Sequence, residues 1–203
     1  MVHIVDDDAA IREALVRLCA SDGLDAEAHS SAVELMSRLD ALRPGCIVLD
    51  VRLENESGFD VQEQLLKIHK DIPVIFMTGY GTIPMTVRAM RAGAMEFLTK
   101  PIDPDVLLTA VRSALDVDAE ALSSRADLVS LREQYETLTP REREVLTLVI
   151  GGLLNKQVAA ELGTAEVTAK VHKRRVIEKL GARSVADLIL IAERLGVSAA
   201  RRR

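Results

Sequence analysis

Short apolar runs alternate with longer amphipathic segments through the first half of this 203-residue chain. The runs have the length of buried strands, and the segments between them repeat apolar residues at helical spacing. Such alternation predicts an α/β fold in which helices cover both faces of a parallel sheet. We expect strands at residues 2–5, 46–49, 73–77 and 95–99, with a weaker one near 25–28, and helices at residues 9–21, 31–42, 58–69, 84–92 and 104–115.

Charged residues follow three of the expected strands. Asp6, Asp7 and Asp8 come after the first, Asp50 after the second and Lys100 after the last. The carboxyl ends of parallel strands share one edge of the sheet, where open α/β folds bind ligands. Asp8 is expected to cap the next helix, and the other residues would converge. Two carboxylates about 4 Å apart repel by about 4 kcal/mol at an effective dielectric of about 20, so the cluster predicts a divalent cation.

The chemistry of these residues suggests a role for each in phosphoryl transfer. Mg²⁺ prefers oxygen ligands and keeps several waters, so Asp7 and Asp50 are the expected direct ligands, and Asp6 would act through water. Asp50 is also the expected nucleophile, and Lys100 would balance charge on the transferred group. Thr78 would offer its hydroxyl to a phosphoryl oxygen. Each residue alone is more often a turn former or a cap, but their joint placement at strand ends favours the functional interpretation.

The second half of the chain lacks strand patterns and predicts a bundle of helices. Thr139, Pro140 and Glu142 form an expected helix start with a capping box, and Gly151-Gly152 ends that helix. Two further segments, separated by a turn at Gly163, are typical of a helix-turn-helix unit. The expected helices after the first are residues 155–162, residues 166–180, and a last one from the cap Ser184 to about Leu195.

The two halves carry opposite charge. Residues 1–116 have 11 basic and 19 acidic side chains, whereas residues 138–203 have 13 and 7, which indicates modules with different partners. In the segment 166–180 a basic stripe is expected to face outward and an apolar stripe to pack inward. A solvated charged face is the alternative, but the helix-turn-helix pattern favours DNA binding in the major groove. The basic stripe is Lys170, Lys173, Arg174 and Lys179, and the apolar stripe is Val167, Val171, Val176, Ile177 and Leu180.

Residues 1–116 resemble a response-regulator receiver domain, and the stretch 77–85 is similar to the FixJ-like subgroup. The resemblance implies a five-stranded flavodoxin-like fold and phosphotransfer from a histidine kinase to Asp50. It also implies Mg²⁺, with Mn²⁺ as a substitute, held by Asp6, Asp7, Asp50 and the backbone carbonyl of Arg52. The residues that carry the resemblance are Val5-Asp6-Asp7-Asp8, Leu49-Asp50-Val51-Arg52, Met77-Thr78-Gly79 and Leu98-Thr99-Lys100-Pro101.

Two positions of the receiver-like half correspond to the family's switch residues. The resemblance implies that the Thr78 hydroxyl moves toward the phosphoryl group and that the Phe97 ring rotates inward. The loop after Asp50 departs from the family, because Leu53-Glu54 stand where Met-Pro is usual. Together with Glu56, Glu54 places extra negative charge near the site.

Residues 138–196 resemble the LuxR-type helix-turn-helix family. By position, Lys170, Val171 and Arg174 are expected to contact bases in the groove, and Lys156, Lys173 and Arg175 to contact the DNA backbone. His172 is expected to be structural, with its ring satisfied locally. Ala165 stands where the family has a capping serine, and Thr164 is the expected substitute cap. The carrying residues are 138–146, Gly152, Asn155-Lys156, Ala159, Leu162-Gly163, Thr168, Lys170-Val171-His172 and Lys179-Leu180.

The two resemblances together imply a cytoplasmic two-component response regulator, not an enzyme, with a receiver at 1–116, a helical linker at 117–137 and a DNA-binding domain at 138–203. By analogy it is an activator that forms a homodimer on phosphorylation through Arg88, Arg91 and Arg112. Its partners would be a histidine kinase, double-stranded promoter DNA and RNA polymerase.

Two other functions share part of the pattern. A magnesium-dependent phosphohydrolase would have an acid two residues after its nucleophile, where this chain has Arg52. A DNA-binding protein with a vestigial receiver would not need Asp7, Asp50, Thr78 and Lys100 intact, as they are in this chain.

Three further expectations concern the whole chain. No apolar run approaches the roughly 20 residues of a membrane span, and no signal peptide opens the chain, so we expect no membrane partner. Cys19 and Cys46 lie in apolar patterns and are expected to be buried and reduced. The segment 116–137 is either a solvated continuation of the preceding helix or a short dimerising helix, since Leu108, Leu115, Leu122 and Val129 recur every seven residues.

Overall fold

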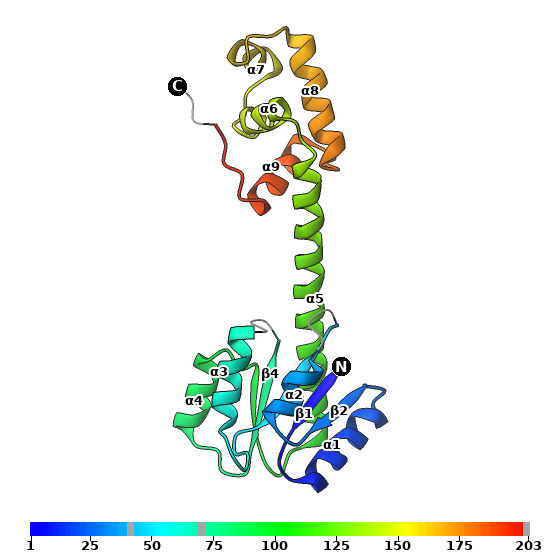
Figure 1. The fold of residues 1–203 in the computed structure, drawn as a ribbon, viewed down its shortest axis with the longest axis vertical. Helices are drawn as coiled ribbons and strands as arrows, with labels where there is room; N and C mark the ends of the chain where they lie inside the picture. Colours follow the sequence, from blue (N-terminus) through cyan, green and yellow to red (C-terminus); the bar gives the residue numbers. More distant parts are fainter. Residues whose placement is uncertain (40–42, 69–71, 201–203) are drawn as a thin grey trace. The chain divides into compact units, whose positions relative to one another are not determined.

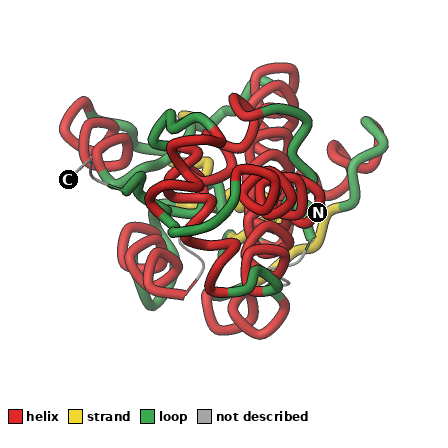
Figure 2. The backbone as a smooth tube through the Cα atoms, turned by 90° about the horizontal axis from the view of Figure 1, so that it is seen from above, coloured by secondary structure: helices red, strands yellow, loops and turns green. Residues whose placement is uncertain are grey.

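The computed structural model describes residues 1–39, 43–68 and 72–200. The chain divides into two compact units, Met1–Ser123 and Ser124–Arg203. Figure 2 colours the chain by type of element, with helices in red and strands in yellow. Within the described ranges, no helix is both long enough and apolar enough to cross a membrane. The elements of the first unit are β1 (Val2–Val5), α1 (Ala9–Ser21), β2 (Ala26–His29), α2 (Ala32–Arg38), β3 (Cys46–Asp50), α3 (Gly58–Ile68), β4 (Val74–Thr78), α4 (Ile83–Arg91), β5 (Glu96–Thr99) and the first part of α5 (Pro104–Glu136).

The strands form one parallel five-stranded sheet in the order β2-β1-β3-β4-β5 (Figure 1). Strands β1, β3 and β4 are fully buried, as expected for strands covered on both faces. The register pairs Val5 with Leu49 and Asp50 with Met77, which aligns the carboxyl ends of the three central strands. The predicted fold class is therefore confirmed, including the weak strand near 25–28. Helix α2 ends at Arg38 and α3 at Ile68, so the predicted helix ends at 40–42 and 69 lie outside the described residues.

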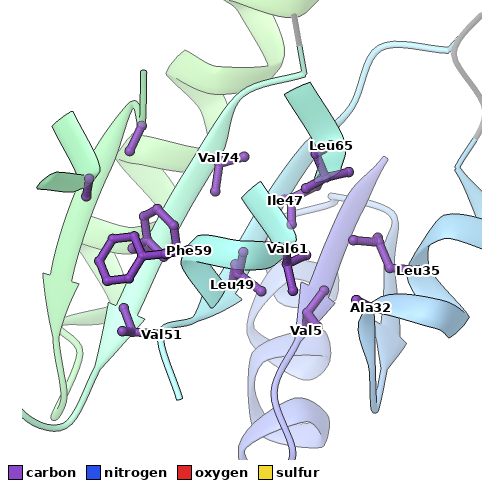
Figure 3. Packing of buried hydrophobic residues seen from close by; sticks show 13 residues of the cluster. Val5, Ala32, Leu35, Ile47, Leu49, Val51, Phe59, Val61, Leu65 and Val74 are labelled. Atoms are coloured by element: carbon purple, nitrogen blue, oxygen red, sulfur yellow. The ribbon is translucent and has the colours of Figure 1, made fainter. Parts of the chain in front are cut away.

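Alternate residues of the strands supply two hydrophobic cores, one on each face of the sheet. Val5, Ile47 and Leu49 pack with residues of α2, α3 and α4, as Figure 3 shows for Leu35, Val61 and their neighbours. The opposite face packs against α1 and α5, and this second core holds both cysteines as free thiols, as predicted. The residues of the second core are Val2, Ile4, Leu15, Cys19, Cys46, Val48, Ile75, Met77, Leu98, Leu107, Val111 and Ala114.

The second unit is helical throughout its described elements. Helix α5 continues without a break to Glu136, so the segment after residue 116 is a helical continuation. The next elements are α6 (Pro140–Ile150), α7 (Asn155–Glu161), α8 (Glu166–Lys179) and α9 (Val185–Arg194). Gly163 adopts a φ of 60° in the turn between α7 and α8. The core consists mainly of Leu138, Val145, Leu146, Val149, Val158, Ala169, Val176, Leu180 and Leu188.

Most predicted helix caps are confirmed. The Asp8 carboxylate accepts a hydrogen bond from the Ala10 amide at 2.8 Å, and the Thr139–Glu142 capping box and the Ser184 cap are both present. The prediction that Thr164 caps α8 is wrong. Ala165 occupies the cap position there, without a side-chain hydrogen bond, because α8 begins one residue later than a Thr164 cap requires.

Two histidines are buried where β1 and β2 pair. His3 Nδ1 and His29 Nε2 lie 3.0 Å apart, and the residues are 5% and 1% exposed. Burial, and then the neighbouring His29, lowers the pKa of His3 from 6.5 to about 4. Burial also lowers the pKa of His29. Both pKa values thus lie below those of the unfolded chain, so the unfolded state binds more protons as the pH falls from about 6.5 toward 4, and folding stability decreases over that window.

Replacing His3 with valine is therefore expected to reduce the acid sensitivity of the fold. Between pH 7 and pH 4.5 the parent protein should lose roughly 2 kcal/mol more unfolding free energy than His3→Val. Urea denaturation of both full-length proteins at each pH, followed by circular dichroism, measures this difference. Parallel pH profiles for the two proteins would show that His3 does not carry the effect.

Candidate functional site

The aligned ends of β1 and β3 place three carboxylates together. One oxygen from each of Asp6, Asp7 and Asp50 lies within 4.8 Å of the others. Asp6 and Asp50 are buried, whereas Asp7 is exposed. The three residues therefore lie together at the ends of the strands, as the sequence predicts. We call these three residues the acidic cluster.

Backbone amides fix the two buried carboxylates. Asp6 Oδ1 accepts a hydrogen bond from the Asp8 amide at 2.9 Å, and Asp50 Oδ1 accepts one from the Arg52 amide at 2.8 Å. These backbone hydrogen bonds use Oδ1, so the Oδ2 atom of each carboxylate can bind other partners. Both side chains are therefore oriented before any ligand binds, which lowers the entropy cost of using them.

Lys100 joins the acidic cluster from the end of β5. Its Nζ donates to Asp6 Oδ2 at 2.6 Å and also to Asp50 Oδ2. Burial alone would lower the pKa of Lys100, but the hydrogen bonds to Asp50 and Asp6 outweigh it and raise the pKa. Burial raises the pKa of Asp6, although its hydrogen bond with Lys100 opposes the rise. One ammonium beside three carboxylates leaves two formal negative charges, and this donor set of oxygens fits a divalent hard cation such as Mg²⁺.

The predicted switch residues lie at the ends of β4 and β5. Thr78 is fully buried, and its Oγ1 accepts a hydrogen bond from the Tyr80 amide at 3.2 Å. The Lys100 amide donates to the Thr78 carbonyl at 2.7 Å, which ties the two strand ends together. The half-buried Phe97 ring packs toward Phe76, with centroids 6.3 Å apart. The Arg52 guanidinium lies over the Tyr80 ring, 4.9 Å from its centroid.

Sequence reasoning missed the role of Gly58, the first residue of α3. A Cβ atom at this position would lie 2.3 Å from the Asp50 carbonyl oxygen, and the Gly58 amide donates to the Val51 carbonyl at 2.9 Å. Only a residue without a side chain allows α3 to start this close to β3. The signal in the sequence was a lone glycine after a polar loop, which by itself is compatible with any turn.

The second candidate site is the outer face of α8. Lys170, Arg174 and Arg175 are exposed, and Lys156 on α7 is exposed as well. Lys173 is only partly exposed. The outward basic face is thus present for most of the residues predicted to contact DNA.

The predicted apolar stripe of α8 is wrong at two positions. Val167 is 74% exposed and Val171 is 44% exposed, whereas Ala169, Val176 and Leu180 are buried. Helix α8 packs on α6 and α7 through the face that carries Ala169. The two valines therefore lie on or beside the basic face and are available to apolar groups of a ligand.

Two further predictions for α8 need correction. Lys179 does not belong to the open basic face, because its Nζ donates to Glu142 Oε2 at 2.6 Å and to the Thr137 carbonyl at 3.0 Å. His172 is not fully satisfied locally, since its buried Nδ1 has no hydrogen-bond partner among the described residues. Both side chains turn toward the bundle, where α8 meets its neighbours.

In the Lys179–Glu142 ion pair, the Glu142 side chain is buried and the Lys179 side chain is partly exposed. Burial alone would raise the pKa of Glu142, but the hydrogen bonds from Lys179 and Thr139 outweigh it and hold the pKa below its ordinary value. We expect Lys179→Met to lower the unfolding free energy of this unit by about 2 kcal/mol, because it leaves a buried carboxylate without its cation. Chemical denaturation of the full chain, followed by circular dichroism, measures the loss.

The exposed pair Arg174–Glu178 provides a matched control for that variant. Its Nε to Oε1 distance is 2.7 Å, but both side chains are mostly exposed, so Arg174→Met should change stability by less than about 0.5 kcal/mol. The contribution of the Lys179 pair should also fall away as the pH drops below the unfolded-state pKa of glutamate, since the folded pKa is the lower one. Equal effects of the two variants at pH 7 would contradict this account.

Comparison with known proteins identifies a family for each half of the chain. The sequence model of the response regulator receiver domain matches residues 2–112, and that of the luxR family of bacterial regulatory proteins matches residues 136–192. Nodulation protein W of Bradyrhizobium diazoefficiens is 46% identical over 199 residues, which cover 98% of this chain and 88% of that protein.

Two solved structures resemble the full length of the chain. The response regulator StyR matches with a TM-score of 0.84 and 45% identity, covering 95% of this chain and 97% of that one. Full-length FixJ from B. japonicum matches with a TM-score of 0.57 and 32% identity, covering 96% of each chain. Both matched family models are those of regulators, which sets aside the phosphohydrolase alternative. The chain belongs to the response-regulator family: it is a two-component transcription regulator with a receiver domain and a LuxR-type DNA-binding domain.

Proposed function

We propose that Asp50 accepts a phosphoryl group from a histidine kinase in the cytoplasm, and that the phosphorylated protein dimerises on promoter DNA and activates transcription. The observation that carries this proposal is the arrangement around Asp50. Its carboxylate is held by the Arg52 amide and by Lys100, with Asp6 and Asp7 beside it. A buried, pre-oriented carboxylate next to a cation is suited to nucleophilic attack on phosphorus.

The transfer forms an oxygen–phosphorus bond at Asp50 and breaks the nitrogen–phosphorus bond of the kinase histidine. Lys100 is placed to pair with an oxygen of the incoming group, and it stays charged because its pKa is raised. Mg²⁺, or Mn²⁺ in its place, would be held by Asp6, Asp7, Asp50 and the Arg52 carbonyl and would offset the negative charge of the phosphoryl oxygens. In this proposal Asp6 and Asp7 hold that cation next to Asp50.

Thr78 and Phe97 are the proposed switch. The Thr78 hydroxyl accepts a hydrogen bond from the Tyr80 amide at 3.2 Å and could exchange that bond for one to a phosphoryl oxygen. Such a move would draw the β4–α4 loop inward and leave room for the half-buried Phe97 ring to turn toward the core. Phosphorylation would then favour one of two receiver conformations.

The proposed dimerisation surface is the face of α4 and α5 that carries Arg88, Arg91 and Arg112. Arg88 lies over the Phe59 ring, 4.4 Å from its centroid, and Arg112 pairs with Asp22. These two arginines would have to change partners for an intermolecular contact. Helix α4 also exposes the apolar side chains Ile83, Val87 and Met90, which supports an interface on this helix.

On DNA, we propose that Lys170, Val171 and Arg174 contact bases and that Lys156, Lys173 and Arg175 contact the backbone. The exposed Val171 suits a thymine methyl group, and lysine and arginine suit guanine edges. Arg174 would exchange its surface pair with Glu178 for a base. Dimerisation raises affinity by placing two α8 helices on neighbouring half-sites.

Lys170→Ala is expected to reduce affinity for a selected binding site by roughly 5- to 100-fold and for random DNA only slightly, because a base contact adds discrimination. Fluorescence anisotropy with both DNA duplexes at one salt concentration measures the two losses. Lys156→Ala is the matched control and should weaken both complexes alike. Equal losses for Lys170→Ala on the two duplexes would assign that residue to the DNA backbone.

Labelling with acetyl phosphate tests the central step. The full chain in Mg²⁺ should gain a phosphoryl adduct of about 80 Da, and peptide mass spectrometry should place it on Asp50. Chelation of the metal should prevent the adduct. An adduct on another residue, or none with a competent donor, would refute the proposal.

A further inference from the structure

We propose that His3, Glu27 and His29 form a second metal site, which binds a transition-metal ion of the zinc class. One ligand atom from each of these residues lies within 4.8 Å of the others. None of them belongs to the acidic cluster. The ligand set of two imidazoles and one carboxylate differs in chemistry from the all-oxygen cluster around Asp50.

The parallel pairing of β1 and β2 creates this site. His3 pairs directly with Glu27, and Val5 pairs with His29 two residues further along the strands (β1 and β2 lie side by side in Figure 1). Because alternate residues of a strand point to one face, the three side chains share a face of the sheet. This is the face that carries Val5 and Ile47, which belong to the core covered by α2.

The nitrogens His3 Nδ1 and His29 Nε2 lie 3.0 Å apart. Two nitrogens bound to a tetrahedral zinc at about 2.0–2.1 Å would lie roughly 3.4 Å apart. The two rings would therefore have to move apart by only about 0.4 Å to admit a zinc ion. The proton that they share would move to the other nitrogen of the ring that carries it. No side chain has to cross the core to do this.

The two buried histidine rings meet through a single contact, between His3 Nδ1 and His29 Nε2. His29 is fully buried, and its Nδ1 has no hydrogen-bond partner among the described residues. A buried polar group without a partner costs stability, and a single hydrogen bond within the pair only partly offsets this cost. A metal bound to His3 Nδ1 and His29 Nε2 would replace that single hydrogen bond with two metal–nitrogen bonds.

A cavity adjoins two of the three proposed ligands, His3 and Glu27. The cavity has a volume of about 250 Å³ and is lined in part by His3, Glu27, Arg38, Arg43 and Gly45. This space can hold a water molecule as a fourth ligand. Arg38 Nε lies 3.9 Å from Glu27 Oε1, but its side chain is largely exposed, so it can move away when a cation takes its place.

The two sites differ in the metal ions that their ligand atoms prefer. Imidazole nitrogen favours zinc and its neighbours, whereas Mg²⁺ prefers oxygen and retains its waters. An excess of Mg²⁺ should therefore occupy the acidic cluster and leave the histidine site open to zinc. This difference makes it possible to test the second site in the intact protein.

The test is isothermal titration calorimetry of the full chain with Zn²⁺ in excess Mg²⁺. We expect one zinc ion per chain, the same stoichiometry for Asp7→Ala, and a loss of affinity of at least about 100-fold for His29→Phe. Co²⁺ in place of Zn²⁺ should give the visible absorption of a tetrahedral site in the parent and in Asp7→Ala. No zinc binding in excess Mg²⁺ would overturn the proposal.

Glu27→Gln provides a second test of the zinc site, which applies even if His29→Phe disturbs folding. Glu27 lies on an edge strand and is partly exposed, so the amide should leave the fold intact. It should lower zinc affinity at least about tenfold, because a charged ligand is lost. Unchanged zinc affinity in both Glu27→Gln and His29→Phe would place the ion elsewhere.

Discussion

Asp50→Asn is expected to abolish phosphoryl labelling and, with it, every phosphorylation-dependent gain in DNA affinity. The amide keeps the size of the side chain and can still accept the hydrogen bond from the Arg52 amide. It lacks the charged oxygen that attacks phosphorus, and it offers Lys100 no negative partner. The fold should survive, since Asp6 continues to hold Lys100 at 2.6 Å.

The measurement pairs labelling with DNA binding. Parent and variant are treated with acetyl phosphate and Mg²⁺, and the affinity for a selected duplex is compared before and after treatment. The parent should gain roughly 100-fold or more from dimerisation, and the variant should gain nothing. Asp25→Asn, an exposed aspartate in the same unit, should behave like the parent. A variant that still responded to the donor would show that DNA binding is switched without Asp50.

The sequence predicted the acidic cluster because a parallel sheet leaves few alternatives. Once the apolar runs are strands of one sheet, their carboxyl ends must meet, and whatever follows them shares one site. The positions of Asp6, Asp50 and Lys100 followed from that topology. The detailed partners did not, because Lys100 bridges two carboxylates through side-chain rotamers that no pattern in the sequence specifies.

Helix α8 shows why side-chain faces are harder to predict. Its apolar and basic residues overlap around the helix, so the pattern allows more than one inward face. Packing on α6 and α7 selects the face with the small residue Ala169, which lets the helices approach closely, and leaves Val167 outside. The ion pair with Glu142 removes Lys179 from the exposed basic face. It joins residues 37 apart in the chain and depends on the same packing. Such choices depend on tertiary contacts rather than on helical period.

Gly58→Ala is expected to damage both stability and phosphorylation. The added methyl group would lie 2.3 Å from the Asp50 carbonyl oxygen and 3.1 Å from the Val51 Cα. These are backbone atoms of β3 and the residue after it, so they cannot turn aside as a flexible side chain would. Overpacking of this kind costs about 3 kcal/mol or more. The strain falls on the residue that carries the nucleophile, so Asp50 should shift relative to Asp6 and Lys100.

Gly79→Ala separates this effect from a general sensitivity of the site to added methyl groups. Gly79 follows Thr78 at the same edge of the sheet, but a Cβ there would meet nothing within 4 Å, and its φ is not positive. Urea denaturation should show a large loss for Gly58→Ala and a change within about 0.5 kcal/mol for Gly79→Ala. At a temperature where both variants are folded, acetyl phosphate should label Gly58→Ala much more slowly than Gly79→Ala. Equal labelling rates would mean that α3 can move away from β3 without displacing Asp50, and the close approach at Gly58 would then serve packing alone.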